Sequence, residues 1–135
     1  MIGKESIGLE SEVRVLKIEP EAVRRFAEAT GAQYNDRVPP TFVVTLRQAN
    51  IPGFELPIPG MIHGEQKITF HREIQIGERL SCKRCIKDVY ARSGKLGNMT
   101  FVVIETTGYD SAAELVFSSN STLIAPIKVD VVREE

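Results

Sequence analysis

The sequence has no tryptophan, two cysteines and two histidines among its 135 residues, so several kinds of functional site have few residues to build them. No apolar run approaches the ~20 residues of a transmembrane helix. Residues 1–6 lack the apolar core of a signal peptide, and we therefore expect a cytoplasmic protein. The 17 basic and 18 acidic residues are well mixed. This argues against binding to nucleic acid or to an anionic membrane, because both need a concentrated basic face.

The only cysteines, Cys82 and Cys85, form a single Cys-x-x-Cys. A structural zinc site needs two more ligands at a matching spacing, and no other cysteine is present. The pair lies in a strand-like run, where residues three apart point to opposite faces and cannot form a disulfide without distortion. We therefore expect both cysteines to be structural, with no metal and no cofactor.

The length indicates one domain, and 42% hydrophobic residues are enough for a core without metal or disulfide support. We expect this domain to span residues 1–126, followed by a polar tail at 127–135. The first half predicts a strand at 13–18 and a helix at 19–30, with Pro20 at its first position and Gly31 as its C-cap. After a loop at 32–40, Thr41 caps a second helix to Asn50, apolar enough to be buried nearly all round.

The second half predicts four antiparallel strands, at residues 62–72, 79–90, 99–109 and 114–124. The run 101–104, Phe-Val-Val-Ile, has no polar face, which predicts burial on both sides, by the domain's own helix or by a partner subunit. A sheet of such strands with one face covered by a buried helix is an α+β architecture.

Both histidines, His63 and His71, lie in the stretch 59–72. Histidine is the side chain whose unperturbed pKa lies near physiological pH, so proton transfer is first sought here. Alternation places Ile62, Gln66, Ile68 and Phe70 on one face of this strand, and His63, Glu65, Lys67, Thr69 and His71 on the other.

Several motifs, in this order and spacing, resemble the hotdog-fold dehydratases and hydratases of the MaoC type. The closest resemblance is to the dehydratase-like region of type I fatty acid synthase and to mycobacterial hydroxyacyl-ACP dehydratase subunits. The resemblance implies a hotdog fold, in which the sheet wraps around the central helix at 41–50. It also implies subunits paired edge to edge and substrates carried as CoA or acyl-carrier-protein thioesters. The matching motifs are Phe-Ala-Glu-Ala-Thr-Gly at 26–31, Pro-Pro-Thr-Phe at 39–42, Ile-His-Gly-Glu-Gln at 62–66 with His-Arg at 71–72, and Gly-Glu-Arg-Leu at 77–80.

The chain departs from the family at its catalytic loop. Catalytic members carry Gly-Asp-x-Asn-Pro-x-His just after the first helix. Here Ala32 stands at the Asp position, Tyr34 is the best match to the His, and the Asn-Pro pair is missing. Alanine cannot accept a proton, and tyrosine is a weak base at neutral pH. The usual dyad is absent.

Among the remaining candidates, His63 is the strongest, as a general base or as part of the acyl-thioester channel, with Asp36 or Glu65 as its partner. Asp36 would replace the lost acid or form an Asx turn, and Tyr34 would hydrogen-bond a substrate hydroxyl. His71 is expected at the surface. The substrate-binding candidates are Thr41 and Phe42, whose backbone N–H groups begin the central helix, and Gly60 and Gly64, which allow close backbone approach.

The positively charged residues Lys83, Arg84, Lys87 and Lys95 would contact CoA phosphates or simply be solvated. Three functions remain open. The first is a dehydratase subunit without the dyad, which pairs with a hotdog chain that carries it. The second is an independent homodimeric hydratase that uses His63. The third is an acyl-thioester binding module without turnover, or a hotdog thioesterase. Fold alone does not choose among them.

Overall fold

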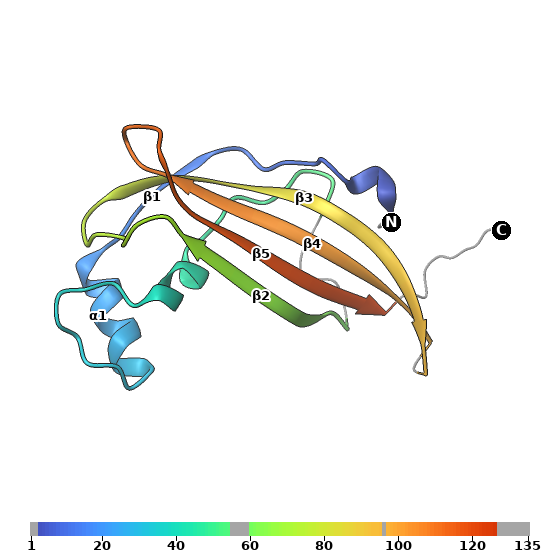
Figure 1. Cartoon of the computed structure of the whole chain (residues 1–135), viewed down its shortest axis with the longest axis horizontal. Helices are drawn as coiled ribbons and strands as arrows, with labels where there is room; N and C mark the ends of the chain where they lie inside the picture. The colour runs from blue at the N-terminus through green and yellow to red at the C-terminus, as the bar shows by residue number, and fades with distance from the viewer. Residues whose placement is uncertain (1–2, 55–59, 96, 127–135) are drawn as a thin grey trace.

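The computed structural model describes residues 3–54, 60–95 and 97–126. Its main element is a five-stranded sheet with the order β1-β3-β4-β5-β2, in which every neighbouring pair is antiparallel (Figure 1). The strands are β1 (Arg14–Lys17), β2 (Ile62–Phe70), β3 (Arg79–Gly94), β4 (Gly97–Tyr109) and β5 (Leu115–Pro126). The predicted antiparallel α+β architecture is confirmed. The tail at 127–135 lies outside the described residues.

The first helix, α1 (Pro20–Ala29), confirms the predicted helix at 19–30. Pro20 occupies its first turn, and Val23 and Ala27 are buried against the sheet. Gly31 follows the helix with a φ of 78°, a left-handed conformation that glycine adopts without a steric penalty. Capping and amphipathic spacing are local signals, so the sequence alone predicts this element well.

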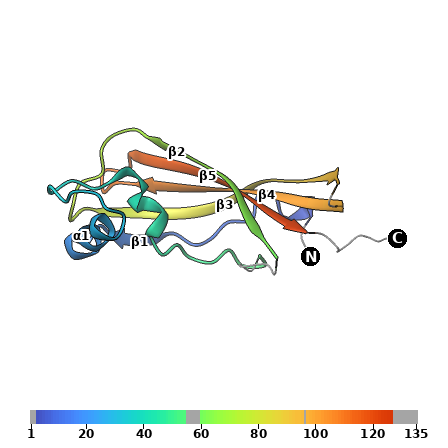
Figure 2. The same cartoon turned by 90° about the horizontal axis from the view of Figure 1, so that it is seen from below.

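The predicted second helix, from Thr41 to Asn50, is wrong. The structure has only a 3₁₀ helix, Pro40–Thr45, and Leu46 already has an extended backbone with φ −68° and ψ 136°. Val43, Val44 and Thr45 are β-branched and disfavour an α-helix. Val44 is 52% exposed, so the segment is not buried all round. Figure 2 shows α1 and the 3₁₀ helix on the same side of the sheet, toward one end of its strands.

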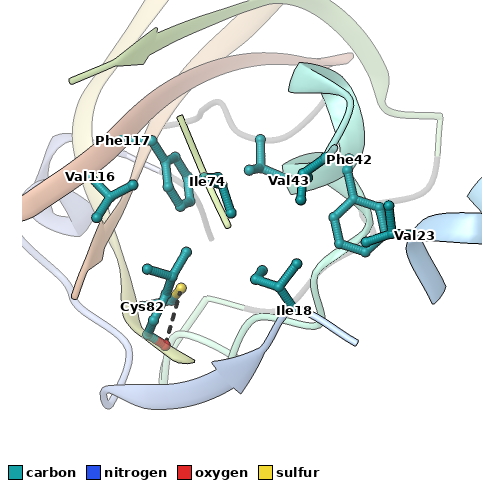
Figure 3. Packing of buried hydrophobic residues seen from close by; sticks show 10 residues of the cluster. Ile18, Val23, Phe42, Val43, Ile74, Cys82, Val116 and Phe117 are labelled. Atoms are coloured by element: carbon teal, nitrogen blue, oxygen red, sulfur yellow. Dashed lines mark hydrogen bonds between the residues drawn. The ribbon is translucent and has the colours of Figure 1, made fainter. Parts of the chain in front are cut away.

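The core consists of two clusters on the inner face of the sheet. The first joins α1, the 3₁₀ helix and the sheet through Val23, Phe42, Cys82 and Phe117 (Figure 3). The second lies under the segment that contains Ile51 and Phe54, which pack on Ile86, Val89, Val102 and Ile104. The second cluster therefore anchors the irregular chain that follows the 3₁₀ helix.

The apolar run 101–104 in β4 is buried on one side only in the single chain. Val102 and Ile104 are buried, whereas Phe101 and Val103 are half-buried. Phe101 stacks on Tyr90 of the neighbouring strand with ring centroids 5.1 Å apart. The chain itself therefore does not supply the two-sided burial that the run suggested.

Candidate functional site

A cavity of about 590 Å³ lies between the loop at 32–40 and the segment at 70–74, and we call it the loop cavity. The loop lines it with Ala32, Gln33, Asn35 and residues 37–40. The opposite wall is the end of β2 and the segment after it, from Phe70 to Ile74. The loop that carries catalytic residues in the resembling family thus borders this cavity.

The loop begins where α1 ends. The backbone N–H of Ala32 donates to the carbonyl of Ala27 at 2.8 Å, which turns the chain away from the helix. Asp36 has a φ of 63° and is exposed. Val38 is buried in the first core cluster and fixes the far end of the loop. Tyr34 packs half-buried against that cluster, with the Arg24 guanidinium 5.4 Å from its ring centroid.

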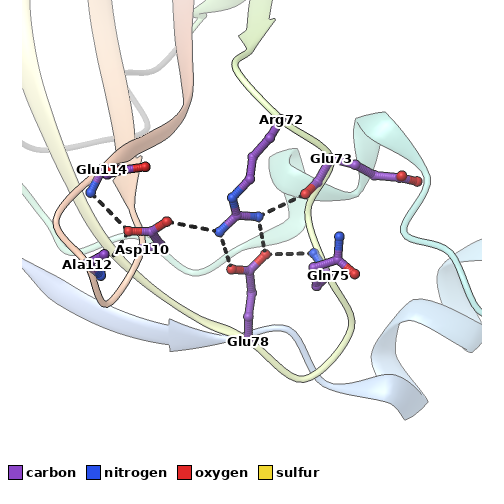
Figure 4. A network of polar contacts seen from close by, with 7 residues as sticks. All are labelled: Arg72, Glu73, Gln75, Glu78, Asp110, Ala112 and Glu114. Carbon is purple, nitrogen blue, oxygen red and sulfur yellow. Dashed lines mark hydrogen bonds and ion pairs between the residues drawn. The ribbon is translucent and has the colours of Figure 1, made fainter.

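The opposite wall is held by Arg72 (Figure 4). Its guanidinium donates to both carboxylate oxygens of Glu78, at 2.7 and 3.0 Å, and to Asp110 at 3.2 Å. The hydrogen bond from Arg72 lowers the pKa of the Glu78 carboxyl below its usual range. Backbone N–H donation from Glu114 lowers the pKa of Asp110, with Arg72 adding to the effect. The network ties the end of β2 to two neighbouring turns.

His71 lies on this wall, where its backbone N–H donates to the carbonyl of Val116 at 2.8 Å. Across the cavity, Arg37 donates to Glu73 at 2.9 Å and joins the loop to the wall. This hydrogen bond lowers the pKa of Glu73. Glu73 is therefore already paired with Arg37, and His71 lines the same wall of the cavity.

His63 lies far from this cavity, at the start of β2. It pairs with Leu123 of β5 next to an irregularity in the register, and it is exposed. Seven residues separate it from Phe70 at the cavity, a span of roughly 20 Å along a strand. Within the described residues, no hydrogen bond or ion pair joins His63 to Asp36 or Tyr34. The structure therefore does not bring these three candidates together in one chain.

The proposed substrate-binding residues are also spread out. Thr41 is exposed, whereas Phe42 is 3% exposed and packs edge-on against Phe26 with ring centroids 5.6 Å apart. Gly64 allows close approach of β5, since a Cβ there would lie 2.8 Å from the Ile124 Cδ1 atom. Gly60 has a φ of 78° and lies near Pro126. Close packing of the chain at Gly60 and Gly64 against side chains of β5 explains why glycine is present at both positions.

The positively charged residues of β3 differ in their surroundings. Lys83 pairs with Glu10 at 3.4 Å, and Lys87 pairs with Glu105 at 3.6 Å. Arg84 faces inward, and its Nη2 atom donates to the Ala49 carbonyl at 2.8 Å. The sequence suggested an exposed position for Arg84, but strand alternation places it on the face of Cys82 and Ile86.

Cys82 and Cys85 are both free, which agrees with the predicted structural role. Burial raises the pKa of the Cys82 thiol to about 11. The described residues contain no group of three or more metal-ligating side chains. They also contain no helix long and apolar enough to cross a membrane.

The sequence did not single out the cavity wall formed by His71, Arg72 and Ile74. Their position depends on where the end of β2 lies relative to a loop some thirty residues earlier. Strand alternation assigned His71 to a face but did not show what lies opposite it. The one signal for this wall in the sequence is that His71 lies near the end of the predicted strand at 62–72.

Comparison with known proteins gives consistent results. The family model described as "FAS1-like, dehydratase domain region" matches residues 32–119. A UPF0336 protein of Saccharopolyspora erythraea is 30% identical over 126 residues, covering 78% of each chain. A UPF0336 protein of Streptomyces griseus is 29% identical, covering 78% of this chain and 81% of that one.

Solved structures share the fold. The HadBC (3R-hydroxyacyl-ACP dehydratase) complex of Mycobacterium tuberculosis matches with a TM-score of 0.73 at 18% identity, covering 89% of this chain and 97% of that one. The ChsH1-ChsH2 complex of the same organism matches with a TM-score of 0.70 at 17% identity, covering 86% and 88%. The antiparallel sheet is thus a hotdog fold, as in these solved structures, and the chain belongs to the family described as FAS1-like, dehydratase domain region.

Proposed function

We propose that this chain is a subunit of an (R)-3-hydroxyacyl-thioester dehydratase that pairs with a second hotdog chain carrying the catalytic dyad. One observation carries the proposal. The loop at 32–40 lines the loop cavity, yet it has Ala32 and Tyr34 where catalytic members of the resembling family have Asp and His. The scaffold of the site is kept, but the acid and base of the loop are not.

The chemistry explains why a partner is needed. Dehydration removes a proton from C2 and protonates the departing hydroxyl, so it requires a base and an acid on one substrate. It also requires N–H donors for the thioester oxygen. The loop cavity offers the His71 imidazole and the amides of Gln33 and Asn35, but Glu73 is paired with Arg37 and Asp36 does not line the cavity. A second chain would supply the acid and the base that this loop lacks.

The position of β2 supports such a partner. It is an edge strand of the sheet, and Ile62 on it is 59% exposed. An open edge is a template for pairing with another chain. Two of the solved structures with this fold are two-chain complexes, and one is described as a 3R-hydroxyacyl-ACP dehydratase. We accordingly take an acyl-CoA or acyl-carrier-protein thioester as the substrate.

Co-expression tests this proposal. The chain is produced with a hotdog protein that contains the complete Gly-Asp-x-Asn-Pro-x-His motif, and the purified material is assayed for hydration of a trans-2-enoyl thioester. We expect a stable two-chain complex with activity, and no activity from this chain alone. A homodimer that binds no dyad-bearing chain would contradict the proposal.

An independent homodimeric hydratase is the second candidate, and β2 supplies its supporting observation. If two copies paired antiparallel through β2 with Lys67 at the centre, residue 63 of one copy would lie opposite residue 71 of the other. His63 would then reach the second copy's loop cavity. This candidate predicts hydration by the purified chain alone, and activity without any partner would favour it over the first.

A further inference from the structure

A second cavity, of about 220 Å³, lies deeper on the inner face of the sheet, and we call it the belt cavity. The sheet contributes Arg84, Thr106, Ser119, Ser121 and Gln66 from four strands, and the segment after the 3₁₀ helix contributes Gln48. None of its described lining residues is acidic.

Strand register places the polar residues together. Arg84 lies opposite Thr106, and Thr106 lies opposite Ser119. Ser121 and Gln66 are opposite each other in the next row. These five residues form a polar belt across the sheet between the two hydrophobic clusters. Ser119 is buried and Arg84, Thr106 and Ser121 are half-buried, so polar groups left without partners here carry a desolvation cost.

The belt carries a positive charge that has no anionic partner among the described residues. Arg84 is half-buried, and its Nε and Nη2 atoms donate to the neutral carbonyl of Ala49 at 3.2 and 2.8 Å. None of the ion pairs within the described ranges includes Arg84. Burial lowers the pKa of this guanidinium, and the nearby charge of Arg14 lowers it further. An anion near Arg84 would offset both effects.

Hydrogen-bonding capacity is also left over in the cavity. The Oε1 atom of Gln48 is buried and has no hydrogen-bond partner among the described residues, which is uncommon in folded proteins. Gln66 donates to the Ser119 hydroxyl at 2.7 Å, which leaves the Ser119 proton free to donate in turn. A polar ligand would accept a hydrogen bond from the Ser119 hydroxyl. A water molecule bound to that ligand would donate to the Oε1 atom of Gln48.

The belt cavity is separate from the loop cavity. Phe70 lines the loop cavity and Phe117 lines the belt cavity, and their ring centroids are 6.3 Å apart. Among the described residues, none lines both cavities. The two rings therefore lie between neighbouring cavities, and a ligand in the belt cavity would contact a set of residues different from those of the proposed thioester site.

We propose that the belt cavity is a binding site for a short-chain carboxylate, with Arg84 and the Thr106 hydroxyl on the carboxylate and the apolar side chains of Val43 and Leu46 around its carbon chain. A guanidinium with converging hydroxyls is a strong arrangement for carboxylate binding. At about 30 Å³ per water-sized group, the volume holds roughly seven such groups, which suits an acid of about four carbons.

Butyrate is the probe, and butyramide is its neutral counterpart of equal size. Each is titrated into the protein at constant ionic strength while backbone amide NMR shifts are recorded. We expect saturable shifts at Thr106, Ser119 and Ser121 with butyrate, and binding of butyramide about tenfold weaker, because the charge-assisted bonds are lost. Equal binding of the two, shifts confined to other residues, or no saturable binding would overturn the proposal.

Variants locate the site. Thr106→Val keeps the shape but removes one hydroxyl, and we expect about tenfold weaker butyrate binding. Arg84→Gln is expected to abolish it, and Arg92→Gln, which removes the same charge from the exposed end of β3, is the matched control. If Arg84→Gln fails to fold, since Arg84 also binds Ala49, Thr106→Val decides the test. Unchanged affinity in Thr106→Val would contradict the assignment.

Discussion

Arg37 and Glu73 join the two walls of the loop cavity through one 2.9 Å hydrogen bond between side chains that are both largely exposed. The bond connects residues 36 positions apart, and it is the described ion pair that reaches from the loop to the opposite wall. Exposed pairs of this kind contribute little to global stability. Its effect is therefore expected in the local motion of the loop.

We expect Arg37→Gln to speed hydrogen exchange of the loop amides at 32–38 while leaving the melting temperature nearly unchanged. The reason is that the loop loses the ion pair that joins it to the wall but keeps its buried anchor at Val38. Hydrogen exchange with mass spectrometry measures this. Glu21→Gln breaks another exposed pair, with Arg24 of α1, and serves as the control. Equal exchange in all three proteins would show that the bond does not hold the loop.

The Arg72 network should stabilise the protein in a pH-dependent way. We expect Arg72→Ala to cost about 1 kcal/mol at neutral pH, a small value because the guanidinium is 38% exposed and screened by solvent. The pKa values of Glu78 and Asp110 are lowered in the folded state. Their stabilising contribution is thus present above the ordinary carboxylate pKa of about 4 and is lost as pH falls through the lowered values.

Denaturant unfolding at several pH values tests this. The gap between wild type and Arg72→Ala should be largest near neutral pH and should shrink as the solution becomes more acidic than about pH 4. A gap that is constant across this range would mean that packing of the arginine side chain, and not its charge, stabilises the wall.

Two histidine variants separate the catalytic alternatives. For a dyad-less subunit in complex with its partner, His63→Ala should change the hydration rate by less than about tenfold, because the partner supplies acid and base. For an independent homodimer, His63→Ala should reduce the rate by about 10² to 10⁴, the contribution of a general base. Steady-state kinetics with a trans-2-enoyl thioester measures the hydration rate of His63→Ala in either case. The same rate is measured for His71→Ala, the variant of the other histidine.

Gly108 in β4 allows Phe117 to pack across the sheet. A Cβ atom at Gly108 would overlap the Phe117 ring, which is 1% exposed and cannot move freely. We expect Gly108→Ala to destabilise the protein by about 1 to 3 kcal/mol, a usual range for overpacking. Gly94→Ala is the control, since a Cβ there meets nothing within 4 Å. Equal stability of the two variants in denaturant unfolding would refute this account.

The two cysteines should differ in reactivity. Burial raises the pKa of Cys82 to about 11, so little thiolate forms at pH 8, and the side chain is 1% exposed. We expect iodoacetamide to modify Cys85, which is half-buried, faster than Cys82 in the folded protein. Mass spectrometry of timed samples checks this, and unfolding in denaturant should remove the difference. Faster labelling of Cys82 would contradict its placement in the core.

Elements set by local pattern were predictable from the sequence. Pro20 and Gly31 delimit α1, and alternation with turn residues delimits the strands. The predicted helix from Thr41 to Asn50 is wrong for a physical reason. The segment is apolar, but its β-branched residues Val43 and Val44 disfavour an α-helix. Ala32 and Tyr34, at the positions where the resembling family has Asp and His, can be read directly from the sequence, and the loss of the dyad stays a prediction from it. The position of His71 at the loop cavity and the inward direction of Arg84 were not, because both depend on how distant strands pair.

The strand order has a consequence for how the chain acquires its fold. Among the described strands, β2 pairs with β5, which follows it in the sequence only after β3 and β4. Until residues 115–126 emerge from the ribosome, both edges of β2 are unpaired, including the exposed Ile62. Pairings between sequence-distant strands are slow and leave edges open to association. A nascent chain of this protein would therefore pass through a stage at which another hotdog chain could pair with β2 before its own β5 does.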